Sequence, residues 1–142
     1  MLIGVHPILT PDILHALASM GHGDSLVIVD ANFPATSVAH HTILGKPCTL
    51  SCDALVALDA ILTHLPVDTY SPEIPAVQGM QVVGEPDTIP LVVADAAAMF
   101  ENHTIALVER MAFYEAAKQA FVIIKTNEAR PYGNFLIRKG VA

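Results

Sequence analysis

An uninterrupted apolar run at residues 26–29, Leu-Val-Ile-Val, constrains the fold of this 142-residue chain more than any other feature. A strand with one face in water alternates apolar and polar side chains, whereas a strand covered on both faces is apolar throughout. This run is too continuous for an edge strand, and it ends at the polar residue Asp30. It therefore predicts a central, buried strand.

Helical patterns occur on both sides of this run. The first, residues 10–20, has Thr10 at the capping position, Pro11 at the first helical position and Gly21 after its end. A second is expected to begin with Ser51 as its cap. The helices predicted after the first lie at residues 51–65, 88–100 and 111–120.

Further strands are predicted at residues 104–108, 121–124 and 134–137. The proline-rich middle of the chain predicts short strands joined by turns, one of them at Val82 and Val83. Strands and helices alternate, and no repeat or linker divides the chain. The sequence therefore predicts a single α/β domain over residues 1–142 with a layered sheet.

Charged residues make up 15% of the chain and apolar residues 53%, compared with about 25% charged in an average soluble domain. No apolar run approaches the roughly 20 residues that a membrane-spanning helix needs, and Pro7 and Asp12 interrupt the amino terminus early. We therefore expect no signal peptide, no membrane contact and a cytoplasmic location. The apolar excess then predicts a homo-oligomer, because obligate subunit interfaces resemble a domain core.

The charge and the metal-ligating residue types exclude several classes of partner. The formal net charge is −7 and the basic residues are scattered, which argues against nucleic acid. Cys48 and Cys52 match neither a redox nor a zinc pattern and are expected to be buried thiols. Seven histidines, including the adjacent His40 and His41, show no ligand spacing. We expect no metal site.

Four polar clusters stand where strands or helices are predicted to end, which is where ligands bind in α/β sheets. They are residues 21–24, with His22 between two glycines; residues 30–34, beginning with Asp30; residues 109–115, with Arg110; and residues 132–134, Tyr-Gly-Asn.

Each cluster also has a structural interpretation. His22 can stabilise the carboxyl end of a helix, and Asp30 can cap the following helix. Arg110 can form a surface ion pair with Glu109 or Glu115, and Tyr-Gly-Asn is an ordinary turn sequence. Residue by residue, the sequence leaves both interpretations open.

Five ordered motifs over nearly the whole chain resemble the L-fucose mutarotase and D-ribose pyranase family. They are P-x-L-T-P-D-I-L at residues 7–14, M-G-H-G-D at 20–24, D-A-x-F-P at 30–34, R-x-A-F-Y-E at 110–115 and P-Y-G-N at 131–134. Arg110 and the Tyr-Gly-Asn motif favour the fucose branch. Asn32 and Thr36 stand where that branch usually has histidines, in the loop after Asp30.

The resemblance implies a three-layer α/β/α domain with a mostly parallel, mixed sheet, assembled as a ring, often a decamer. It implies a cofactor-free mutarotase that interconverts the anomers of a free monosaccharide, L-fucose first. His22 would be the acid/base catalyst. The substrate-binding residues would be Asp30, Arg110, Tyr132, Gly133 and Asn134.

Acid/base ring opening needs only positioned proton donors and acceptors, and histidine suits this role because both its protonation states are accessible near neutral pH. The main alternative is a sugar-binding or regulatory module that uses the same pocket without turnover. A metal-dependent hydrolase or isomerase is a weaker alternative, because the histidines lack ligand spacing.

Overall fold

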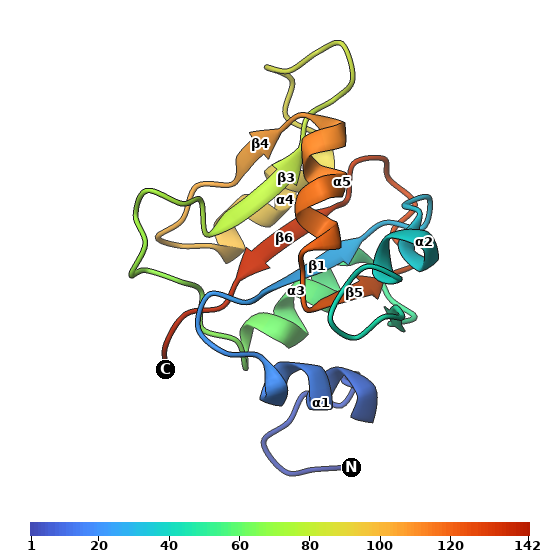
Figure 1. The fold of residues 1–142 in the computed structure, drawn as a ribbon, viewed down its shortest axis with the longest axis vertical. Helices are drawn as coiled ribbons and strands as arrows, with labels where there is room; N and C mark the ends of the chain where they lie inside the picture. Colours follow the sequence, from blue (N-terminus) through green and yellow to red (C-terminus); the bar gives the residue numbers. More distant parts are fainter.

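A six-stranded mixed sheet forms the centre of the computed structural model, which describes residues 1–142 (Figure 1). The strand order is β2-β5-β1-β6-β3-β4, and β6 alone runs antiparallel to its neighbours, β1 and β3. The predicted central strand is therefore confirmed. The strands are β1 (Ser25–Val29), β2 (Cys48–Thr49), β3 (Val77–Met80), β4 (Ala106–Val108), β5 (Val122–Lys125) and β6 (Phe135–Arg138).

Alternate side chains of the strands enter two separate apolar cores. Leu26 and Ile28 of β1 point to one face of the sheet, while Val27 and Val29 point to the other, and all four are fully buried. This explains why residues 26–29 show no polar alternation, since neither face of β1 reaches water.

Helices cover both faces, which confirms the expected three-layer α/β/α domain (Figure 1). One face carries α1 (Pro11–Ser19), α3 (Ala54–Leu62), α4 (Leu91–Ala96) and the short 3₁₀ helix η1 (Ala97–Met99). The other carries α2 (Ala35–Ala39) and α5 (Arg110–Lys118). None of these helices has the length and apolar character that crossing a membrane requires.

The predicted capping residue is correct for α1 and wrong for α3. Thr10 caps α1 as predicted, accepting a hydrogen bond from the backbone N–H of Ile13. For α3 the predicted cap, Ser51, is wrong: Asp53 caps the helix by accepting from Val56 N at 2.9 Å. Residues 50–52 cannot be helical because their backbone is hydrogen-bonded to the β5 region, through Leu50 N to Lys125 O and Asn127 N to Cys52 O.

Some short elements differ from the predictions. The two-residue strand β2 was not predicted, and the five-residue helix α2 was considered only as a helix that Asp30 could cap. Val82 and Val83 do not form a strand. They begin a tight turn in which Glu85 N donates to Val82 O, and Gly84 adopts a left-handed φ of 78°. Glycine reaches that conformation without the steric cost a β-carbon would bring.

A buried carboxylate joins the loop after β5 to the beginning of α3. Glu128 is 3% exposed, and its side chain accepts hydrogen bonds from Ala54 N and from the backbone and guanidinium of Arg130. Arg130 also donates to Asp95 at 2.7 Å. The Arg130 guanidinium, followed by the backbone donors, lowers the pKa of Glu128 from 4.5 to about 2.

Replacing Glu128 by glutamine is expected to lower the free energy of unfolding at pH 7 by about 1 to 3 kcal/mol. The folded-state pKa of Glu128 lies below the unfolded one, so its contribution is fully present above pH 4.5 and is lost as the pH falls toward 2. Urea unfolding of wild type and Glu128→Gln at pH 7 and pH 3, at one protein concentration, measures the difference.

The matched control is Glu115→Gln, which removes a carboxylate that is 67% exposed and pairs with Lys118. It should change stability by less than about 0.5 kcal/mol. An effect of Glu128→Gln that is equally large at pH 3 and pH 7 would contradict the ion-pair explanation.

Candidate functional site

Residues from three of the four predicted clusters meet in one pocket at the end of β1 and the beginning of β6. The pocket has a volume of about 220 Å³. It contains four of the predicted sugar-binding residues, and Gly133 lies between two of them. The lining residues are Asp30, Asn32, Phe33, Met80, Val83, Arg110, Tyr114, Pro131, Tyr132 and Asn134. Thr36, which was expected in the loop after Asp30, lies in α2 instead and does not line the pocket.

Asp30 closes the pocket by linking two loops. Its Oδ1 accepts from Asn32 N at 3.0 Å and Phe33 N at 2.9 Å, and its Oδ2 accepts from Gly133 N at 3.2 Å. The Asp30 N–H in turn donates to Asn134 Oδ1 at 3.0 Å. A carboxylate oxygen has two acceptor positions, so Oδ2 retains one for a ligand hydroxyl. Asp30 does not cap α2, which begins after Pro34 without a side-chain cap.

The Tyr132-Gly133 pair is more constrained than an ordinary turn. Tyr132 has a left-handed φ of 63°, which costs a non-glycine residue about 1 to 3 kcal/mol. Its hydroxyl accepts a hydrogen bond from Val83 N at 3.1 Å. A β-carbon at Gly133 would come within 2.7 Å of Glu128 Cγ and 3.4 Å of Asp30 Cβ. This backbone is therefore held in one arrangement, with the Tyr132 side chain at the pocket.

Arg110 is exposed and lines this pocket as well as a neighbouring hollow beside Glu109. Its guanidinium forms no ion pair or hydrogen bond in the chain. The alternative interpretation of Arg110, a surface ion pair with Glu109 or Glu115, is not what the structure shows. Glu109 caps α5 by accepting from Met111 N and Ala112 N, which lower the pKa of its carboxyl, and Glu115 binds Lys118. An unpaired arginine in a pocket is suited to hydrogen-bonding the oxygens of a ligand.

His22 lies apart from this pocket, in the turn before β1. Its Nε2 is 3.0 Å from Asp68 Oδ1, and its side chain is 43% exposed. Asp68 is buried and also accepts from Tyr70 N at 2.9 Å and Arg138 Nε at 3.0 Å. The backbone donor of Tyr70, aided by His22 and Arg138, lowers the pKa of Asp68.

Sequence reasoning missed Asp68 and Arg138. Asp68 follows the proline that ends the α3 region and lies 46 residues after His22, within a segment without regular structure. No spacing rule connects two such positions. A weak signal existed for Arg138, because it directly follows the last predicted strand, residues 134–137. In the structure it is the last residue of β6 and pairs with Ser25 of β1.

One strand separates the two groups of residues. His22 precedes β1 and Asp30 follows it, and a five-residue strand spans about 17 Å. The fold therefore brings Asp30, Arg110, Tyr132, Gly133 and Asn134 together, but it places His22 at the opposite end of β1. Within a single chain, His22 does not reach the pocket.

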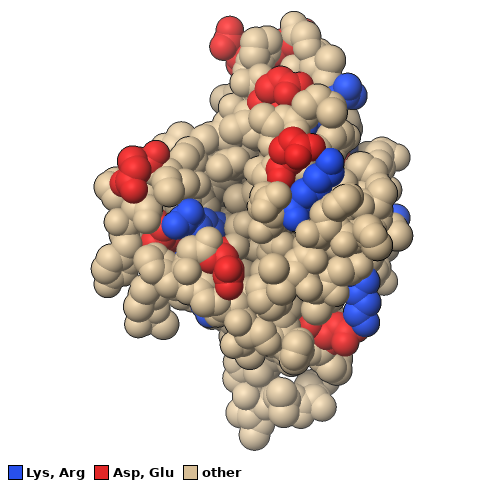
Figure 2. Space-filling model, in the orientation of Figure 1, with Lys and Arg blue, Asp and Glu red and all other residues tan.

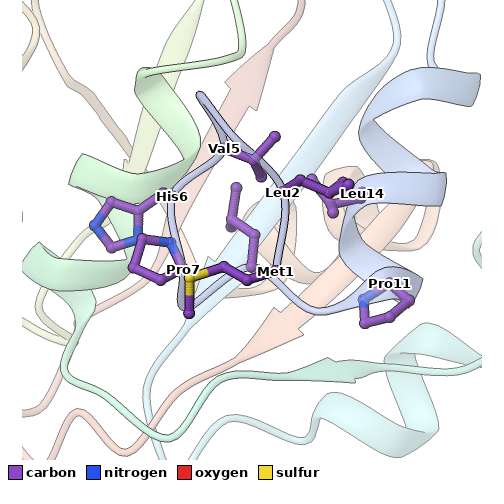
Figure 3. A pocket seen from close by; sticks show the side chains of 8 residues that line it. Met1, Leu2, Val5, His6, Pro7, Pro11 and Leu14 are labelled. Carbon is purple, nitrogen blue, oxygen red and sulfur yellow. The ribbon is translucent and has the colours of Figure 1, made fainter.

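The remaining candidate groups form no second catalytic arrangement. No three His, Cys, Asp or Glu side chains are grouped so that they could hold a metal ion. Cys48 and Cys52 are free thiols. Cys48 is buried, as expected, whereas Cys52 is only half-buried, and partial burial raises the pKa of both. A larger hollow of about 350 Å³ lies between the amino-terminal loop and α1, lined mainly by apolar side chains such as Leu2, Val5 and Leu14 (Figure 3).

Known proteins with related sequences match this chain over nearly its whole length. The L-fucose mutarotase of Histophilus somni is 40% identical over 99% of this chain and 97% of its own length. Human fucose mutarotase is 38% identical, covering 97% of this chain and 92% of the relative. A fucose mutarotase from Streptococcus pneumoniae, solved in complex with L-fucose, is 35% identical, covers 99% of both chains and superposes with a TM-score of 0.83.

The model of the RbsD / FucU transport protein family matches residues 3–142. This match spans both the pocket and the His22 turn, and it confirms the resemblance that the five sequence motifs indicated. The chain therefore belongs to the RbsD / FucU family.

Proposed function

We propose that this protein is a mutarotase that interconverts the anomers of a free monosaccharide, with L-fucose as the first candidate. The observation that supports this most is the pocket itself, which joins Asp30, Arg110, Tyr132 and Asn134 at one end of the sheet. The named relatives, alike in length and 38–40% identical, act on fucose.

The composition of the pocket suits a 6-deoxy sugar. The pocket offers hydrogen bonds to several sugar hydroxyls. They come from the Arg110 guanidinium, the free acceptor position of Asp30, and the donor and acceptor positions of Asn134 and Tyr132 that are not used within the chain. Phe33, Met80 and Val83 supply apolar wall. A 6-deoxyhexose presents both kinds of surface, hydroxyls on the ring and a methyl group at carbon 6.

Anomer exchange requires ring opening and closing. A base removes the proton of the anomeric hydroxyl while an acid protonates the ring oxygen, and after rotation of the aldehyde the steps reverse. No electron or group leaves the sugar. Two positioned proton-transfer groups are therefore sufficient, and such groups typically accelerate a reaction by about 10² to 10⁴. His22 is the residue proposed as one of these two groups.

In this proposal the site is shared between two subunits: His22 of one subunit faces the pocket of another. Three observations support it: the two parts lie at opposite ends of β1, the His22 ring is exposed, and Arg110 has no partner within the chain. The surface also suits association. On the face shown in Figure 2, charged side chains lie in a few small groups with uncharged surface between them, and Met1, Leu2 and Ile3 are all more than 60% exposed. A closed ring, such as a decamer, repeats one such contact around its axis.

Saturation-transfer NMR on L-fucose, D-ribose, D-galactose and L-rhamnose tests the activity. The expected result is that the protein accelerates exchange between the α and β signals of L-fucose beyond the uncatalysed rate, with less acceleration of sugars that differ at carbon 6 or in hydroxyl configuration. Binding of these sugars without accelerated exchange would overturn the enzymatic proposal and support the sugar-binding module instead.

A further inference from the structure

We infer that Asp68 is a positioning residue that holds His22 in the tautomer with the proton on Nε2, so that Nδ1 is the nitrogen that exchanges a proton with the sugar. The inference rests on the proposed function for the role of His22. Its structural part, the tautomer, is independent of any activity.

The contact geometry assigns the proton. Asp68 Oδ1 is 3.0 Å from His22 Nε2, and the buried carboxylate already accepts hydrogen bonds from Tyr70 N and Arg138 Nε. An ionised carboxylate accepts hydrogen bonds and donates none. The Nε2 atom must therefore be the donor, whether the imidazole is neutral or protonated. In the neutral ring, Nδ1 is then the unprotonated nitrogen and has no partner in the chain.

Asp68 itself is held firmly enough to orient the imidazole. Its backbone N–H donates to Arg138 O at 3.0 Å, which joins Asp68 to the carboxyl end of β6. Gly140 packs against the same backbone, where a β-carbon would lie within 2.9 Å of Asp68 Cα. Both the main chain and the side chain of Asp68 are thus fixed, whereas the His22 ring is free on its exposed side.

The other charged groups near His22 do not replace this contact. Asp24 accepts from Gly21 N at 2.8 Å and closes the turn. Lys139 donates to Met20 O, and Arg138 donates to Asp68. Tyr70 meets the His22 ring edge-on, with 5.7 Å between ring centroids. Only Asp68 forms a hydrogen bond with the imidazole.

Heteronuclear NMR of protein with isotope-labelled histidine reads the tautomer from the chemical shifts of the two ring nitrogens. The His22 signals are assigned by their loss in His22→Gln. In the wild type at neutral to mildly alkaline pH, the expected result is a neutral ring protonated at Nε2. Dominance of the Nδ1-protonated form would overturn the inference, and this measurement requires no Asp68 variant to fold.

Asp68→Asn supplies the functional arm, because an amide can donate as well as accept and no longer dictates the tautomer. We expect mixed tautomers at His22 and an exchange rate on L-fucose lowered at least about tenfold. Asp24→Asn is the control. It removes a carboxylate from the turn that contains His22, and this carboxylate does not contact the imidazole, so the His22 tautomer should be unchanged.

The outcomes separate the two proposals. A slower Asp68→Asn enzyme with an unchanged His22 tautomer would overturn the positioning role. A wild type that fails to accelerate exchange of any sugar, yet holds His22 protonated at Nε2, would overturn the proposed function and leave the tautomer assignment standing.

Discussion

Replacing His22 by alanine is expected to lower the rate of anomer exchange by about 10² to 10⁴ while leaving the fold intact. The side chain is 43% exposed, packs in neither apolar core and makes a single hydrogen bond, to Asp68. Its loss removes the proposed proton-transfer group and costs little packing. Saturation-transfer NMR on L-fucose gives the rate, and light scattering with thermal unfolding reports the assembly and its stability.

His15 provides the matched control, since it is an exposed histidine on α1, remote from the pocket. His15→Ala should retain wild-type exchange. Equal exchange rates in wild type and His22→Ala, on a sugar that both proteins bind, would exclude His22 as the acid/base group.

Mixed assemblies of His22→Ala and Arg110→Ala subunits are expected to regain a large part of the activity that each variant lacks alone. If each site takes its pocket from one subunit and His22 from a neighbour, then random mixing in equal amounts leaves about one quarter of the sites intact. With each variant at or below about 1% of the wild-type rate, activity should rise more than tenfold. Co-expression with two different tags, followed by tandem purification, yields the mixed assemblies for the exchange measurement.

The control mixes wild-type subunits with the double variant His22→Ala/Arg110→Ala, which also leaves about one quarter of shared sites intact. Comparable activity in both mixtures is the result expected of a shared site. If the His22→Ala and Arg110→Ala mixture has no more activity than its two components, the catalytic histidine and the pocket do not come from different subunits.

Local sequence signals predicted much of the fold because they act over a few residues. Thr10 and Pro11 begin α1 where they were expected to, since a helix cap depends only on groups within one turn. Residues 26–29 identified the central strand because burial on both faces removes polar alternation. Ser51 failed as a cap because hydrogen bonds to the β5 region keep residues 50–52 out of the helix. That constraint comes from residues more than 70 positions away.

Some members of the pocket were predictable but its chemistry was not, and Met80 and Val83 line it without having been predicted as site residues. The ordered motifs named Asp30, Arg110 and Tyr132, and the sheet topology does bring these three together. The fold alone shows that the Asp30 carboxylate is largely occupied by backbone donors, that Arg110 is unpaired, and that Tyr132 adopts a left-handed backbone.

By itself, then, the sequence determined the layered α/β class and the central strand, and its motifs named Asp30, Arg110, Tyr132 and Asn134 among the residues that line the pocket. Only the tertiary structure decided that His22 lies at the far end of β1 from Asp30 and that Asp68 is its partner. The physical reason is that helix caps and strand faces depend on neighbours within a few residues. A contact between irregular segments 46 residues apart depends on how the whole sheet is ordered, which no local pattern encodes.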